Sequence, residues 1–106
     1  MKIYLSPQVS TSGDRIQYSF DKDVVKVEYK GKKDVFNFLA MPDGVAENIT
    51  SELSFSPIIS AKRVNGELMV ELLNHIDINA TEFEKFPKWI DYKEYKEPSP
   101  PKRGED

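Results

Sequence analysis

The sequence predicts a small, mainly β domain. We expect a small antiparallel sheet built from a meander and a hairpin, sandwich- or barrel-like, with at most one short helix and an extended C-terminal arm. Two observations lead to this fold class. Apolar and polar residues alternate over several short stretches, which is the pattern of half-buried strands. In addition, Asn65-Gly66 joins two apolar runs across residues 58–73, and this dipeptide is the strongest short-range signal for a β-hairpin.

The elements follow in order along one domain. With 106 residues the chain has the length of a single domain, which we place at residues 1–96, followed by a flexible, proline-rich and charged tail at residues 97–106. The first strand covers residues 2–5, and we expect Pro7 to stop it because proline cannot donate to a ladder. Three strands in meander order are predicted at residues 15–20, 25–30 and 34–40, with a polar turn at 21–23 and a Gly-first connection at Gly31-Lys32.

Residues 45–55 suit a short amphipathic helix, because Val45, Ile49 and Leu53 are spaced by four residues. Serine and β-branched residues in the same stretch weaken its helix propensity.

An aromatic cluster follows the hairpin. Its members recur every three residues: Phe83, Phe86, Trp89, Tyr92 and Tyr95. That spacing imitates a helix stripe, but Pro87 interrupts it and would cost ~3 kcal/mol inside a helix. We therefore expect an extended arm, anchored by Phe86 and Trp89, that covers the apolar face of the sheet.

Composition limits the function classes. A formal net charge of −3 argues against nucleic-acid binding, which needs a basic face to neutralise phosphates. No apolar run approaches the ~18 residues of a membrane span, so we expect no membrane partner and a chain that stays in the cytoplasm where it is made. Because the chain has no cysteine, neither disulfides nor thiolate metal ligands are available.

No motif of reaction chemistry is present. His75 is the only histidine, and nothing in the setting of Ser60 or Asp77 selects them as its nucleophile or orienting carboxylate. Four acidic residues lie near turns and are expected to be solvated charges rather than metal ligands: Asp21, Asp23, Glu82 and Glu84. We therefore expect no catalytic residues, no cofactor, no metal and no enzymatic activity.

The candidate interaction residues are Phe86, Trp89, Tyr92 and Tyr95. Aromatic side chains dominate interface energetics because they bury large areas at low entropic cost. The alternative is that they complete the core of the domain itself. That alternative is the stronger one for Phe86 and Trp89, whereas the two stand even for Tyr92 and Tyr95, which lie among charges at the exit from the domain.

Four features in order resemble one protein group. They are the opening MKIYLSP, the segment VFNFLAMPDGV, the hairpin RVNGELMVELL and the pair Phe86-Pro87. Together they are similar to short, largely uncharacterised tail-module proteins of tailed bacteriophages and prophages. The chain departs from that group by a longer span between residues 15 and 33 and by NHIDINATE where the group carries a proline-rich apolar segment.

The resemblance implies a non-enzymatic structural or assembly protein of a phage tail, which acts through protein contacts. Its partners would be other tail or fibre proteins, or further copies of itself. It would be in the host cytoplasm during assembly and then, if structural, in the tail of the virion. The alternative is a soluble phage-encoded modulator that binds and inhibits a host protein.

Overall fold

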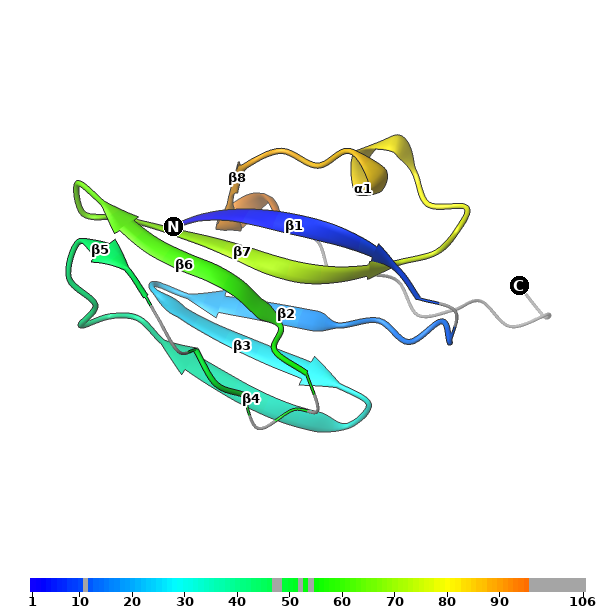
Figure 1. Cartoon of the computed structure of the whole chain (residues 1–106), viewed down its shortest axis with the longest axis horizontal. Coiled ribbons are helices and arrows are strands. Elements are labelled where there is room, and N and C mark those ends of the chain that lie inside the picture. The colour runs from blue at the N-terminus through cyan, green and yellow to red at the C-terminus, as the bar shows by residue number, and fades with distance from the viewer. Residues whose placement is uncertain (11, 47–48, 52, 54, 96–106) are drawn as a thin grey trace.

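The structure is a computed structural model that describes residues 1–10, 12–46, 49–51, 53 and 55–95. Two β-sheets lie face to face around one hydrophobic core (Figure 1). The larger sheet has the order β5 (Gly44–Val45), β6 (Ile58–Val64), β7 (Glu67–Ile76), β1 (Lys2–Val9) and β8 (Ile90–Asp91). The smaller sheet has the order β2 (Gln17–Asp21), β3 (Val24–Tyr29) and β4 (Lys32–Asn37). The predicted mainly β fold is confirmed.

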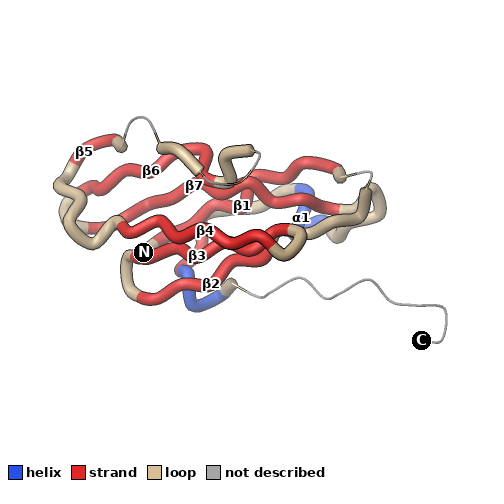
Figure 2. Tube along the Cα trace, turned by 90° about the horizontal axis from the view of Figure 1, so that it is seen from below, coloured by secondary structure: helices blue, strands red, loops and turns tan. Residues whose placement is uncertain are grey.

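The core forms where the inner faces of the two sheets meet. Burial alternates along β3 and β7, as expected for strands with one face covered. The larger sheet contributes Ile3, Ile58, Ala61, Leu68, Val70, Leu72 and Ile90, the smaller one Tyr18, Val25, Val27 and Phe36, and Phe38 joins them just after β4. The strands of both sheets run along the same long direction of the molecule (Figure 2). The prediction that the aromatic arm covers the hairpin was therefore wrong, because the meander provides that cover.

Both predicted hairpin regions exist, with one difference in a turn. Asn65 and Gly66 have φ values of 50° and 82°, as a type I′ turn requires, and they join Val64 to Glu67. In the second turn of the meander, between β3 and β4, the positive φ values fall at Lys30 (51°) and Gly31 (78°). That turn lies one residue earlier than the Gly31-Lys32 connection predicted, because the pairing of Tyr29 with Lys32 leaves Lys30 and Gly31 as the loop.

The first strand is longer than predicted and pairs differently. β1 extends through Pro7 to Val9 and runs parallel to β7, so the larger sheet is not purely antiparallel. The Ser10 N–H donates to the Ile76 carbonyl at 2.9 Å. Because backbone groups alternate along a strand, the amide position of Pro7 faces the opposite edge, where proline removes no bond to β7.

Arg63 on β6 ties the two sheets together at one end. Its guanidinium donates to the carbonyls of Phe38 (2.7 Å), Met41 (2.7 Å) and Gly66 (3.1 Å). It also pairs with the Asp23 carboxylate at 3.0 Å, and its side chain is only 11% exposed. The planar guanidinium of Arg63 thus joins the turn at Asp23, the turn at Gly66 and the segment after β4.

The helices are short. The helix predicted across residues 45–55 includes Glu47, Asn48, Glu52 and Ser54, which lie outside the described residues, and among the described ones only Val45 belongs to a regular element, the strand β5. After β7 come α1 (Glu82–Lys85) and the 3-10 turn η1 (Tyr92–Glu94). α1 ends before Pro87, in agreement with the argument that proline ends any helix here.

Candidate functional site

The segment after β7 is held by two capping boxes. The Thr81 side chain accepts from the Glu84 N–H, and Glu84 accepts from the Thr81 N–H. Asp91 and Glu94 make the same exchange at η1. Both capping boxes are visible in the sequence as a Thr or Asp followed three positions later by Glu. This signal predicts the two helical turns, but the regular spacing of the aromatic residues obscured it.

Arg15 fixes α1 against the sheets. Its guanidinium donates to the His75 carbonyl at 2.9 Å and pairs with Glu84 at 3.3 Å. The helix also lies against β1 (Figure 1). The segment between α1 and β8 carries Phe86 and Trp89. It is therefore held at both ends, by α1 at its start and by the pairing of β8 with β1 at its end.

Phe86 and Trp89 lie outside the core. Ile90 pairs with Ile3 and is buried, so strand alternation turns its neighbour Trp89 to the outer side of the sheet. The Trp89 ring lies 5.5 Å from that of Tyr4 and remains 40% exposed, and Phe86 is 77% exposed. The side chains of Tyr4, Phe86 and Trp89 are named the aromatic patch below. The expectation that Phe86 anchors the arm was wrong, and Trp89 contacts the outer side of the sheet.

Tyr92 and Tyr95 pack on the fold instead. The Tyr92 N–H donates to the Met1 carbonyl at 3.1 Å, and its ring lies 6.1 Å from that of Phe20. The Tyr95 ring lies 5.3 Å from Phe20, and its hydroxyl accepts from the Tyr18 N–H at 3.2 Å. These two tyrosines thus close the gap between β1 and the edge strand β2, and they belong to the packing that holds the sheets together.

Side-chain oxygens occupy two backbone amides along the edge formed by β4 and the residues that follow it. The Val35 N–H donates to the Asp34 side chain at 2.8 Å, and the Leu39 N–H donates to the Asn37 side chain at 2.9 Å. Each of these amides is occupied by a side-chain oxygen two or fewer residues away. Because an edge recruits another strand through unpaired amides, these two positions are poorly suited to strand addition.

His75 packs between aromatic rings. Its ring lies 5.6 Å from Tyr29 and 5.8 Å from Phe55, and Nδ1 is 3.3 Å from the Asp14 carbonyl. Hydrogen bonds from Ser12 and Lys30 hold the pKa of the Asp14 carboxyl below its ordinary value. Among the described residues, no three metal-ligating side chains gather at one point.

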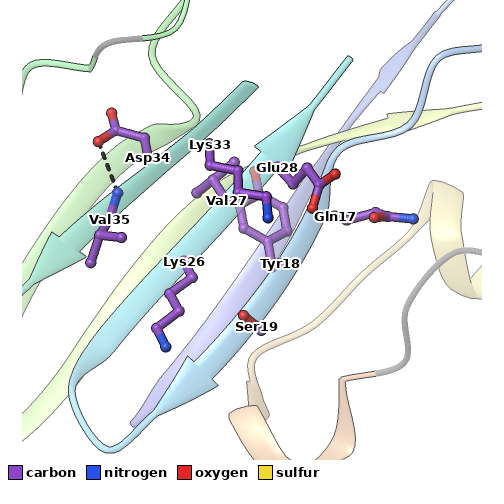
Figure 3. A pocket seen from close by; sticks show the side chains of 9 residues that line it. All are labelled: Gln17, Tyr18, Ser19, Lys26, Val27, Glu28, Lys33, Asp34 and Val35. Carbon is purple, nitrogen blue, oxygen red and sulfur yellow. Dashed lines mark hydrogen bonds between the residues drawn. The ribbon is translucent and has the colours of Figure 1, made fainter. Parts of the chain in front are cut away.

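The outer face of the smaller sheet carries a shallow hollow of about 200 Å³ (Figure 3). Cross-strand pairing aligns Gln17, Glu28 and Lys33 in one row, and Ser19, Lys26 and Val35 in the next. The floor is the backbone of the sheet, and the rim is mixed in charge.

No protein-family model, no curated protein and no solved structure matches this chain. In the part of the chain that the structure describes, no helix is long and apolar enough to span a membrane. The class that the fold defines is therefore a mainly β domain of two small sheets, with exposed aromatic side chains beside β1.

Proposed function

We propose that this chain is a non-enzymatic protein-interaction module that acts in a phage tail or in its assembly, and that the aromatic patch is its contact surface. One observation carries the proposal: Phe86 and Trp89 are left in solvent by a segment that buries Ile90 and packs Tyr92. Large aromatic side chains are the commonest anchors of protein interfaces. The phage context rests on the sequence resemblance.

The edge strands of the two sheets indicate how a partner would bind. The Val35 N–H on β4 and the Leu39 N–H just after it are occupied, and Pro7 removes a donor from the outer edge of β1. Strand addition is therefore disfavoured at these edges. Side-chain burial of Phe86 and Trp89 in a partner pocket is the favoured mode.

Mass spectrometry of purified particles tests the tail role. We expect this polypeptide in particles at a stoichiometry set by the tail symmetry. If it is absent from particles and co-purifies instead with one host protein, the alternative role of a soluble modulator replaces the tail role. In binding tests of variants in the aromatic patch, Val45→Ala provides the matched surface control. Val45 is 70% exposed and lies on β5, at the other edge of the larger sheet from β8.

A further inference from the structure

Two lysines flank the exposed rings of the aromatic patch. Residues 85–89 read KFPKW, so Lys85 directly precedes Phe86 and Lys88 directly precedes Trp89. Lys85 ends α1, and both lysines are exposed. Consecutive Cα atoms are about 3.8 Å apart and lysine carries its charge on a flexible stem, so each ammonium can lie beside a group that contacts the neighbouring ring. Lys85 and Lys88 are named the basic rim below.

The charges of the basic rim are not used inside the domain. Among the described residues, the cations of the ion pairs are the Met1 amine, Arg15, Lys30 and Arg63. The lysines that lie over aromatic rings are Lys30 and Lys93. The basic rim takes part in neither kind of contact, so both ammonium groups are available to a partner. The tail predicted at residues 97–106 lies outside the described residues, and no step below depends on it.

The carboxylates nearest in sequence are placed elsewhere. Glu84 pairs with the Arg15 guanidinium at 3.3 Å, and the Asp91 carboxylate accepts a backbone N–H at 3.0 Å. Glu82 lies at the opposite end of α1 from the basic rim. Residues 85–89 therefore form a positively charged stretch on a chain whose formal net charge is −3.

The sheet side of the aromatic patch has the opposite charge. Tyr4 and Glu71 are cross-strand partners, so their side chains share the outer face of the larger sheet. Glu71 is half-buried there and accepts only a long hydrogen bond, 3.5 Å, from the Ser60 hydroxyl. Because potentials across an interface are complementary, carboxylates of a partner belong beside the basic rim and away from Glu71.

We propose that the partner segment that binds the aromatic patch is acidic, with an apolar or aromatic side chain against Phe86 and Trp89 and carboxylates beside Lys85 and Lys88. This inference rests on the proposed function, since it names the chemistry of the partner for the same surface. Two cations are too few to favour a nucleic acid, whose binding depends on neutralising many phosphates. Recognition of an anionic lipid surface usually takes clusters of about four or more Lys or Arg.

Trp89 is the only tryptophan in the chain, so its fluorescence reports on the aromatic patch. The probe is a random copolymer of glutamate and tyrosine, titrated into the full chain while Trp89 is excited where tyrosine does not absorb. We expect saturable binding that weakens about fivefold in Lys85→Gln/Lys88→Gln, the loss of two exposed ion pairs. Glu71→Gln should bind no less tightly than the parent chain.

Lys26→Gln/Lys33→Gln is the matched control. It makes the same change of charge at two exposed lysines on the outer face of the smaller sheet, and it should bind the copolymer as the parent chain does. All variants replace exposed or half-buried polar residues, so their urea midpoints should confirm that they remain folded.

Equal binding of the copolymer by the parent chain and by Lys85→Gln/Lys88→Gln would overturn the proposal. So would equal binding of a lysine–tyrosine copolymer, since the rings alone would then suffice. Binding to phosphatidylserine vesicles or to polyuridine as tight as to the glutamate–tyrosine copolymer would also overturn it, because the surface would then recognise anions in general.

The proposed function and this inference fail separately. If the partner that co-purifies with the chain binds Phe86→Ala more weakly but Lys85→Gln/Lys88→Gln equally well, the aromatic patch remains the contact surface and the acidic partner is wrong. If Phe86→Ala leaves the affinity for that partner unchanged, the proposed contact surface is wrong whatever the copolymer does.

Discussion

Replacing Arg63 by Met should remove the strongest polar link between the two sheets. The substitution keeps an apolar stem but deletes donors to three backbone carbonyls and to the Asp23 carboxylate. Each neutral hydrogen bond contributes about 1 kcal/mol net, and leaving buried acceptors unpaired adds to the loss. The Asp23 pair adds less, because that carboxylate is partly exposed and water replaces its partner. We expect a loss of about 3–5 kcal/mol in the free energy of unfolding.

Urea denaturation measures this change as a lower midpoint at unchanged slope. Lys62→Met is the control, since Lys62 precedes Arg63 on β6 and is exposed, and it should stay within about 0.5 kcal/mol of the parent chain. Arg63→Lys should fall between the two, because one ammonium cannot reproduce the planar fork. A loss below about 1 kcal/mol for Arg63→Met would refute the account, since water would then satisfy these carbonyls equally well.

Three further predictions concern the core, a turn and an edge. Tyr18→Phe deletes a buried hydroxyl that bonds to the Leu73 carbonyl, and calorimetry should register a loss of about 1–3 kcal/mol. Burial also raises the pKa of the Tyr18 phenol, so the native state retains its proton; stability of the parent chain should fall as pH rises above about 10, more steeply than in Tyr18→Phe. Gly66→Ala places a side chain at φ 82° and should cost about 1–2 kcal/mol in urea unfolding. Asp34→Ala/Asn37→Ala frees two edge amides, and light scattering should detect concentration-dependent association that the parent chain lacks.

The local elements were predictable because their signals are local. The alternation of apolar and polar residues and the Asn65-Gly66 turn together specify the β6–β7 hairpin, and these two signals lie within a few residues of each other. The parallel partnership of β1 with β7 was not, since it joins residues about 67 positions apart, as Lys2 with Met69. Nor did the position of Pro7 reveal which edge its missing donor would face, because that depends on the partner strand.

The candidate interface residues show the same limit. Phe86, Trp89, Tyr92 and Tyr95 are equally spaced and similar in hydrophobicity, so the sequence does not separate packed rings from exposed ones. Their directions depend on Ile90, whose pairing with Ile3 turns Trp89 outward. The alternative favoured for Phe86, completion of the core, was wrong, and Tyr4 was missed although it alternates with the buried Ile3.

The most direct test of the central claim is the effect of Phe86→Ala on binding to the particle or partner with which the parent chain co-purifies. Phe86 is 77% exposed, so its free energy of unfolding should change by less than about 0.5 kcal/mol. If the aromatic patch is the contact surface, affinity should fall about 10-fold or more, while Val45→Ala binds as the parent chain does. Unchanged affinity for Phe86→Ala, in a chain that remains folded, would contradict the claim.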